Sequence, residues 1–450
     1  MTVARVVIAG GGIGGLTLAH ALIDDLAQRG VAADVRVIEA AADAGGHART
    51  IVDEAWVVET GPNGFLDNEP ETLDLIRQLG LEARTVESNV VARRRFVVRD
   101  GRLCKVPESP AALLASDCIS WRGKLRLLRE PWAPGPPNDV DETVFDFAER
   151  RIGREATETF VDTAVSGISA GDSRTLSLRS QFPNLHEWER THGSLFRAML
   201  AQPRRSKGRA RLLSFDRGLG TLTTTLSERL RDRITTGVAV DSVCRQAGSW
   251  RVGLSNGTSL AADHVVLAMP SQVTSRALRA VDGELSSMLA AIPYAGLSVV
   301  ALAYPSAALP HSLDGYGYLV PRAEKLSTLG VLWESSIFAG RAPADGALLR
   351  VFLGGALRPD VLDLSNEELV GVARREIAQV MGLTTSPSER WVFRWPSAIA
   401  QYTVGHHERV TAIRARLVAH PGLDVCGTAY DGVSFNSAIA NARRTARDLA

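Results

Sequence analysis

The chain has 450 residues, of which 45% are hydrophobic and 22% are charged, and its formal net charge is +1. This composition is typical of a globular protein, and the length favours two or three domains because single hydrophobic cores stop growing near ~250–300 residues. A net charge so close to zero provides no long-range field for nucleic acid, so we expect no nucleic-acid partner.

The four cysteines are scattered along the chain and form no C-x-x-C pair. Their spacing therefore predicts neither a disulfide framework nor a zinc site, and it favours a reducing cytoplasm. The apolar N-terminal stretch is interrupted by glycines and followed by Asp24 and Asp25, and the longest apolar runs elsewhere have the length of strands. We expect no signal peptide and no membrane-spanning helix, although the protein could lie on a membrane surface.

The first elements of the chain form a predicted βαβ unit. Residues 4–10 are β-branched and apolar, which is typical of a buried parallel strand. Residues 16–26 place apolar side chains on one helical face, and Gly30 ends this helix. A second strand follows at residues 34–40.

A glycine motif lies between the first strand and the first helix. Gly10, Gly12 and Gly15 have the G-x-G-x-x-G spacing, in which the glycines permit a tight turn, approach to a pyrophosphate and close helix–strand packing. The free N–H groups of the helix N-terminus favour phosphate binding. Glu39, at the end of the second strand, can accept the ribose hydroxyls. The predicted dinucleotide site comprises Gly10, Gly12, Ile13, Gly14, Gly15 and Glu39.

The middle of the chain, from about residue 110 to residue 202, shows helical periodicity, as at residues 143–153. The segment 132–138 precedes that helix and is a predicted turn-rich linker. Residues 204–211 hold five basic side chains. This run is interpreted as a solvated loop or, alternatively, as a patch that faces anionic lipid headgroups.

The β character returns near residue 232. Residues 250–254 alternate, Asn256-Gly257 is a hairpin turn signal, and residues 263–268 form a predicted apolar strand. Further strands are expected within the mixed region 271–403, at residues 297–304 and 348–353, and a final helix from about Phe435 to the C-terminus.

Two segments indicate which dinucleotide is bound. Gly45, Gly46 and Arg49 resemble the G-G-x-x-R stretch of flavoproteins with two dinucleotide-binding domains. Residues 424–432 resemble the segment that closes the flavin site in those proteins, where a helix N-terminus would stabilise the anionic reduced flavin. FAD is therefore the predicted cofactor. The resemblance implies further FAD contacts from Gly61, Pro62, Asn63, Val240, Ala268, Gly427, Tyr430, Gly432 and Val433.

Several stretches in order along the chain resemble the protoporphyrinogen/coproporphyrinogen oxidase family. They are residues 59–66, 166–172 with 176–177, 214–222, 315–321, 394–395 and 401–406. The chain departs from the family pattern at Tyr316 and Tyr318, which replace phenylalanines, at Ala400, which replaces a proline, and in the tail at residues 433–437.

The resemblance implies oxidation of a porphyrinogen to a porphyrin in haem synthesis, by hydride transfer from a meso carbon to flavin N5, with O2 as the acceptor and release of H2O2. Arg95 is the implied partner of a substrate carboxylate, and Arg93 shares its face if the strand alternates, so either could serve. Gly167 would line the cavity, and Tyr316 and Leu319 would sandwich the macrocycle. We expect no catalytic side chain, because the flavin does the redox chemistry, and no metal, because the histidines lack ligand spacing.

The implied fold is α/β, with a Rossmann-type FAD domain interleaved with an α+β substrate domain and a mostly helical insert. We expect the FAD-binding domain at residues 1–85, 212–272 and 409–450, the substrate-binding domain at residues 86–104 and 273–408, and the insert at residues 105–211. The insert, with Arg122, Lys124, Arg126 and Arg129, is the expected region of peripheral contact with the cytoplasmic face of a membrane. The oligomeric state is left open, with a homodimer as one option.

Two other classes of function share part of this pattern. Another flavin oxidase or desaturase, acting on amines or carotenoids, would share residues 10–49 but should lack the Gly167 loop and the 315–321 motif. A non-enzymatic protein similar to the prenyl-GTPase dissociation inhibitors would have the same architecture, but the intact glycine motif, Glu39 and Arg49 argue against it. The choice between protoporphyrinogen and coproporphyrinogen stays open.

Overall fold

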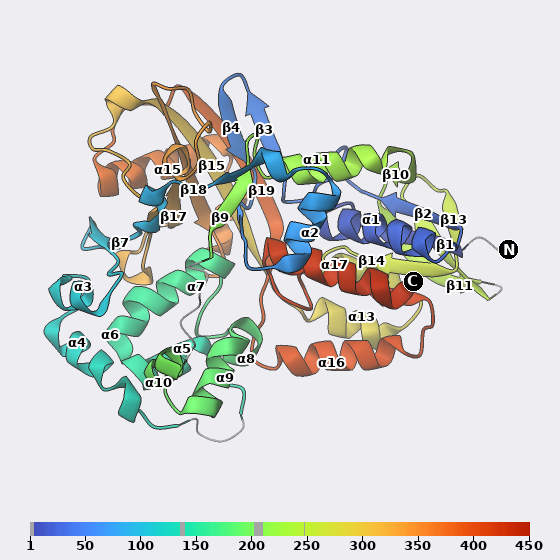
Figure 1. Cartoon of the computed structure of the whole chain (residues 1–450), viewed down its shortest axis with the longest axis horizontal. Coiled ribbons are helices and arrows are strands. Elements are labelled where there is room, and N and C mark those ends of the chain that lie inside the picture. Colours follow the sequence, from blue (N-terminus) through green and yellow to red (C-terminus); the bar gives the residue numbers. More distant parts are fainter. Residues whose placement is uncertain (1–3, 136–139, 202–209, 247) are drawn as a thin grey trace.

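The computed structural model describes residues 4–135, 140–201, 210–246 and 248–450. Figure 1 shows two regions built around β-sheets and a separate group of helices. Both sheet regions are assembled from segments that lie far apart in the sequence.

The first region contains a five-stranded parallel sheet in the order β10-β2-β1-β14-β20. Its strands are β1 (Ala4–Ala9), β2 (Ala33–Ile38), β10 (Ile234–Thr235), β14 (His264–Leu267) and β20 (Leu423–Val425). The predicted βαβ unit is confirmed, with α1 (Ile13–Gln28) between the first two strands. Strand β1 is paired on both sides, which explains its continuous run of β-branched and apolar residues.

Helices cover one face of this sheet and a mixed layer covers the other. The first face carries α1, α2 (Pro70–Gln78), α11 (Gly220–Arg229) and α17 (Phe435–Leu449). The second carries the antiparallel sheet β11 (Val240–Gln246), β12 (Ser249–Leu254) and β13 (Ser259–Ala262), with α12 (Ser271–Leu278), α13 (Gly283–Ala290) and α16 (His406–Leu417). The predicted Asn256-Gly257 hairpin joins β12 and β13. Helix α17, red in Figure 1, packs beside α1, so the two ends of the chain meet in one core.

The second region contains a seven-stranded sheet in the order β19-β15-β18-β17-β16-β7-β8. Its strands are β7 (Phe96–Arg99), β8 (Arg102–Lys105), β15 (Tyr294–Pro305), β16 (Gly317–Leu319), β17 (Thr328–Trp333), β18 (Gly346–Gly354) and β19 (Glu389–Ala400). Helix α15 (Asn366–Met381) packs on one face through an apolar core. Strand β16 pairs in parallel with β7, with Tyr318 opposite Phe96, which brings Arg95 close to the segment before β16.

Two small sheets lie between these regions. They are the hairpin of β3 (Thr50–Asp53) and β4 (Trp56–Glu59), and the sheet of β5 (Phe65–Leu66), β9 (Leu212–Phe215) and β6 (Thr85–Glu87). Strand β4 ends at Glu59, where the chain enters the 59–66 motif.

The predicted helical character of the middle of the chain is confirmed, and the helices there are short. They are α3 (Pro110–Ala115), α4 (Trp121–Leu128), α5 (Val144–Ile152), α6 (Arg154–Ala156), α7 (Asp162–Ser169), α8 (Leu178–Gln181), α9 (Pro183–His192) and α10 (Leu195–Ala201). The Thr143 hydroxyl accepts a hydrogen bond from the N–H of Asp146 and so caps α5 at its start. Arg151 is fully buried and pairs with Glu130 and Glu189, which joins α5 to α9. Most of the predicted linker before α5 is described, but residues 136–138 lie outside the described residues.

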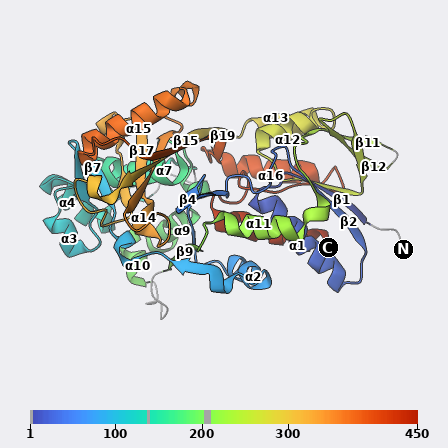
Figure 2. The same cartoon turned by 90° about the horizontal axis from the view of Figure 1, so that it is seen from above.

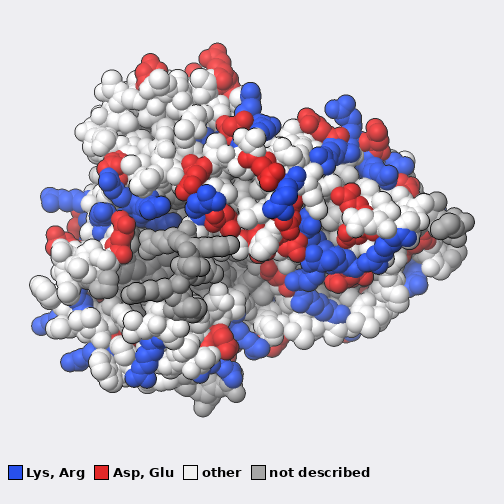
Figure 3. All heavy atoms as spheres, viewed as in Figure 1, with Lys and Arg blue, Asp and Glu red and all other residues white. Residues whose placement is uncertain are grey.

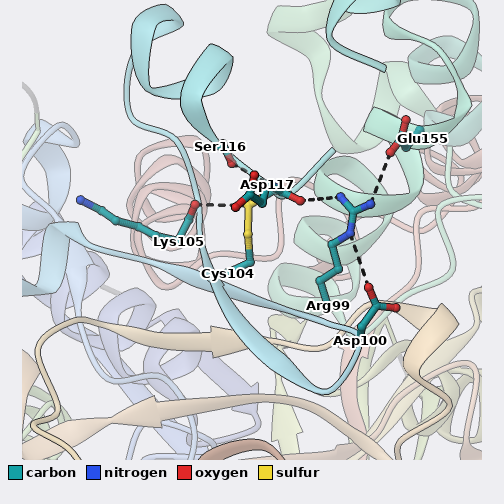
Figure 4. The surroundings of a disulfide bond; sticks show 8 residues. Arg99, Asp100, Cys104, Lys105, Ser116, Asp117 and Glu155 are labelled. Atoms are coloured by element: carbon teal, nitrogen blue, oxygen red, sulfur yellow. Dashed lines mark hydrogen bonds and ion pairs between the residues drawn. A yellow bond between two sulfur atoms is a disulfide. The ribbon is translucent and has the colours of Figure 1, made fainter. Parts of the chain in front are cut away.

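The prediction of no disulfide is wrong. Cys104, at the end of the β7–β8 hairpin, forms a disulfide with Cys118, which precedes α4 (Figure 4). The two Cα atoms are 6.0 Å apart, within the range that a disulfide bridges. Arg99 supports the same junction by donating to the carbonyl of Asp117 and by pairing with Glu155. The fold brings these cysteines together, and their spacing in the sequence carries no motif that could indicate it.

No helix within the described residues is both long enough and apolar enough to span a bilayer. Acidic and basic side chains are interspersed over the face of the molecule shown in Figure 3. This mixing agrees with the net charge near zero.

Candidate active site

The turn after β1 is closely packed against its neighbours. A Cβ added to Gly10 would lie 2.7 Å from the carbonyl oxygen of Ala268, and one added to Gly15 would overlap the carbonyl oxygen of Gly10. Only glycine fits at these positions, because the ends of β1 and β14 and the start of α1 approach one another here. Gly12 is the N-cap of α1 and provides no side chain to bond the first N–H groups, which include those of Ile13 and Gly14. The helix therefore begins with the free donors that a phosphate requires.

Glu39 lies directly beside this turn. Its two carboxylate oxygens accept hydrogen bonds from the N–H of Gly11 at 2.6 Å and from the N–H of Ala41 at 2.8 Å. These bonds hold the carboxylate at the end of β2. A carboxylate can accept about four hydrogen bonds, so acceptor capacity remains for a ribose.

The Gly45–Arg49 stretch closes over the glycine turn. The N–H of Gly45 donates to the carbonyl of Gly11 at 2.7 Å, and a Cβ on Gly46 would lie 3.1 Å from the Cα of Gly12. The Nε of Arg49 is buried and has no hydrogen-bond partner within the described residues. An orphaned buried donor beside a phosphate-type turn fits an acceptor on a bound cofactor.

The segment after β20 reaches the same edge of the parallel sheet. Gly427 and Gly432 both have positive φ, +132° and +102°, which lets the chain bend sharply before α17. The hydroxyl of Tyr402 donates to the carbonyl of Thr428 and accepts from the N–H of Gly432, both at 2.7 Å. Asp431 pairs with Arg414 and with Arg444, so the segment is tied down on both sides.

The other predicted cofactor residues lie around this edge. Val240 and Tyr430 are buried, and Val433 is partly buried, in the core that also holds Ala9 and Ile38. The N–H of Ala268 donates to the carbonyl of Ala9 at 2.8 Å. The carboxyl ends of parallel strands are where ligands bind in such sheets, so these residues fit a dinucleotide.

A buried ion network, which the sequence did not reveal, supports the 59–63 stretch. Arg350 on β18 is fully buried and donates to the carbonyls of Glu59, at 2.9 Å, and Gly61, at 2.7 Å. Its Nε donates at 2.8 Å to Glu334, at the start of α14 (Glu334–Ile337). The carboxylate of Glu59 pairs with Arg341 at 3.3 Å, and burial raises the pKa of Glu59 to about 7. The network fixes the backbone that leads to Pro62 and Asn63.

The predicted substrate residues come together on the face of the seven-stranded sheet opposite α15. The guanidinium of Arg95 lies 5.4 Å from the centroid of the Tyr316 ring, and the Tyr316 hydroxyl lies 3.4 Å from the side chain of Asn63. Gly167 touches Leu319, because a Cβ on Gly167 would lie 2.5 Å from a methyl carbon of Leu319. A cation, an aromatic ring and the amide of Asn63, which is a predicted cofactor residue, thus adjoin one another, and Gly167 and Leu319 form a separate contact.

One detail of the expected substrate site needs correction, and one departure from the family pattern can be placed. Arg93 belongs to a 3₁₀ helix (Val90–Arg93), and β7 begins only at Phe96, so Arg93 and Arg95 do not alternate along one strand. Tyr318 is buried in the core that α15 covers, whereas Tyr316 packs against Ala92 and Ile337. The hydroxyl of Tyr318 is therefore not part of the set formed by Arg95, Tyr316 and Asn63.

Comparisons with known proteins agree with this geometry. Residues 13–450 match the model of the family described as flavin containing amine oxidoreductase. The chain is 32% identical over 477 residues to the protoporphyrinogen oxidase of Homo sapiens, covering 98% of this chain and 97% of that protein. It is 26% identical over 459 residues to the coproporphyrinogen III oxidase of Bacillus subtilis (strain 168), covering 99% and 97%.

Solved structures show the same fold. A protein from Exiguobacterium sp. 255-15, provisionally named a protoporphyrinogen oxidase, superposes with a TM-score of 0.87 at 24% identity, covering 100% of this chain and 99% of that one. The cyclohexylamine oxidase of Brevibacterium oxydans IH-35A superposes with a TM-score of 0.71 at 18% identity, covering 100% and 99%. The chain therefore belongs to the flavin-containing amine oxidoreductases, among the protoporphyrinogen/coproporphyrinogen oxidases, and is an FAD-dependent oxidoreductase.

Proposed function

We propose that this chain oxidises a porphyrinogen, either protoporphyrinogen IX or coproporphyrinogen III, fully to the porphyrin in haem synthesis. When bound, FAD would supply hydride acceptance from the meso carbons with O2 as the final acceptor, so that full oxidation in three two-electron steps would consume three O2 and release three H2O2. The observation that supports this proposal is the contiguous set of Arg95, Tyr316 and Asn63 beside the 59–63 stretch.

The role of the chain itself is to bind and orient the macrocycle. The guanidinium of Arg95 is exposed at the surface end of the set, where it would pair with a propionate. Tyr316 and Leu319 would contact the ring system, and Gly167 lets Leu319 pack closely against α7, because a Cβ there would collide with the Leu319 side chain. Asn63, next to the predicted flavin-binding residues Gly61 and Pro62, would place the reacting carbon relative to the flavin.

Aerobic turnover of both porphyrinogens, followed by porphyrin fluorescence, tests this function. We expect fluorescence to rise with FAD-loaded enzyme, and the ratio of kcat/KM for the two substrates identifies the preferred one. A matched assay with primary amines distinguishes the amine oxidase alternative. Flavin bleaching by an amine, without porphyrin formation, would refute the proposal.

The substitution Arg95→Ala tests the proposed carboxylate contact. Loss of a charge-assisted bond remote from the reacting carbon should raise KM about tenfold and change kcat little. Arg93→Ala is the matched control, because Arg93 is also exposed but lies on the 3₁₀ helix. An unchanged KM for Arg95→Ala, or an equal rise for Arg93→Ala, would remove Arg95 from the site.

The helical part is the proposed region of peripheral membrane contact. Trp121, Leu125 and Leu128 share one face of α4 at intervals of three or four residues and are 66%, 58% and 50% exposed, and the nearby Trp132 is 77% exposed. Figures 1 and 2 show α3 and α4 at the end of the molecule farthest from the five-stranded sheet. An exposed apolar stripe with tryptophans at its edge suits the interface of a bilayer.

The basic residues contribute less to this surface than the sequence suggests. Lys124 is buried and donates to the carbonyl of Leu114, and Arg126 donates to the carbonyls of Arg150 and Arg151. The basic run 204–211 lies outside the described residues except for positions 210 and 211. Sedimentation with liposomes tests the contact: Leu125→Glu should abolish binding to vesicles, whereas binding that persists in this variant would contradict a role for α4.

The proposed domain division follows the two large sheets. The parallel sheet draws on residues 4–38, 234–267 and 423–425, and the seven-stranded sheet on residues 96–105 and 294–400. These segments support an FAD-binding domain and a substrate-binding domain with the boundaries given above, and the helices between residues 110 and 201 support the insert.

A further inference from the structure

Residues 401–404 run between the two loops that the candidate site requires. The flavin-closing loop comprises residues 427–433, and the substrate loop comprises residues 166–172, at the end of α7 and beyond it. The 401–404 segment follows β19, precedes α16 and contacts both loops.

The side chain of Tyr402 holds the flavin-closing loop. Tyr402 is 3% exposed, and its hydroxyl cross-links Thr428 and Gly432 through the two 2.7 Å hydrogen bonds described above. Burial raises the pKa of Tyr402, which keeps the hydroxyl protonated and able to donate. The ring of His406 stacks on the Tyr402 ring with centroids 4.0 Å apart and planes inclined by 11°, which fixes the direction of the hydroxyl.

The same segment holds the substrate loop and the turn after it. The side-chain amide of Gln401 donates to the carbonyl of Ser169 at 2.9 Å. The carbonyl of Tyr402 accepts from the N–H of Ser177 at 2.8 Å. Gly171 packs so closely that an added Cβ would lie 2.5 Å from the side-chain oxygen of Gln401. Gln401 and Tyr402, which are adjacent in the sequence, therefore form hydrogen bonds to the substrate loop and to the flavin-closing loop, which lie about 260 residues apart in the chain.

We propose that Tyr402 is a positioning residue for the flavin, and that Gln401 beside it positions the substrate loop, so that one segment sets the placement of both. Removing the Tyr402 hydroxyl loosens the flavin-closing loop, and removing the Gln401 amide loosens the substrate loop. The role of Gln401 rests on the proposed porphyrinogen function, whereas the role of Tyr402 rests only on FAD binding.

The substitution Tyr402→Phe tests the flavin half. It removes two buried hydrogen bonds, so the dissociation constant of FAD, measured by flavin fluorescence on dilution of the holoenzyme, should rise about tenfold. Tyr304→Phe is the matched control, since Tyr304 is 1% exposed in the core beneath α15 and the change should leave FAD affinity unaltered. A rise of less than twofold for Tyr402→Phe, or an equal rise in the control, would overturn the proposal.

Gln401→Met, which is nearly isosteric, tests the other half. We expect the KM for the porphyrinogen to rise severalfold while the FAD dissociation constant stays within twofold of the unaltered enzyme. A variant that loses FAD affinity and keeps its KM would show that the assignment of the two residues is wrong.

Hydrogen exchange of the unaltered holoenzyme provides a test that no folding defect can obscure. The N–H of Gly432 should be protected, and rapid exchange there would overturn the role of Tyr402. Neither this measurement nor the FAD titration requires a porphyrinogen. A chain that passes both tests and oxidises no porphyrinogen would refute the proposed function and leave the role of Tyr402 standing.

Discussion

Replacing Arg350 with methionine should destabilise the protein strongly, because this side chain is the central cation of a buried network. It lies between the carboxylate of Glu334 and the carbonyls of Glu59 and Gly61, and it is fully buried. Methionine has similar length and is apolar, so Arg350→Met creates little cavity but leaves a buried carboxylate without its partner.

The expected cost follows from these contacts. An uncompensated buried charge costs about 3–5 kcal/mol, and the two carbonyls that lose their donor add to this value. Because the total stability of a globular domain is about 5–15 kcal/mol, the variant should lose a large fraction of it. The same change frees the 59–63 backbone, so the FAD content of the purified variant should also fall.

Urea unfolding of the single and double variants measures this coupling. Glu334→Leu in the Arg350→Met background removes the orphaned carboxylate and should restore about 3 kcal/mol of the loss, since a buried ion pair can be replaced by apolar residues at little cost. A loss below about 1 kcal/mol for Arg350→Met, or a double variant no more stable than the single one, would refute the reasoning.

Three further predictions concern separate parts of the fold. Gly15→Ala should lower the melting temperature and the FAD content, because the new Cβ overlaps a backbone oxygen and overpacking costs about 1–3 kcal/mol. Gly14→Ala is the control: its Cβ would lie 3.9 Å from the nearest neighbouring atom, so the melting temperature should not change. Cys104→Ser opens the loop closed by Cys118 and should cost about 3 kcal/mol in urea unfolding; the same stability before and after reduction of the unaltered protein would contradict this. Burial lowers the pKa of His406 to about 4, below the value near 6.5 in the unfolded chain. The unfolded state therefore binds more protons than the folded state as the pH falls, and the free energy of unfolding should drop by about 2 kcal/mol from pH 7 to pH 5. His406→Phe should lose about 2 kcal/mol less over that interval, and an equal loss would show that His406 is not held neutral.

Short-range patterns in the sequence were sufficient to predict the framework. The βαβ unit with Gly10 and Gly15, the Asn256-Gly257 hairpin and the final helix from Phe435 follow from hydrophobic period and turn chemistry over a few residues, and the structure confirms each of them. The family resemblance placed Arg95 and Tyr316 in one site, and they adjoin one another in the structure. Whether they bind a substrate stays a prediction.

Contacts between distant segments could only be seen in the tertiary structure. Arg350 contacts the carbonyls of Glu59 and Gly61, which lie about 290 residues away in the sequence. Tyr402 follows β19 and Gly432 follows β20, so their hydrogen bond forms only because the fold brings the ends of two different sheets together. The hydrophobic period of a strand predicts which face of the sheet a residue occupies. It does not predict which charged or hydroxyl group from another segment will lie opposite that residue. The sequence therefore determined the elements and the cofactor, and the packing of those elements decided which buried polar groups found partners.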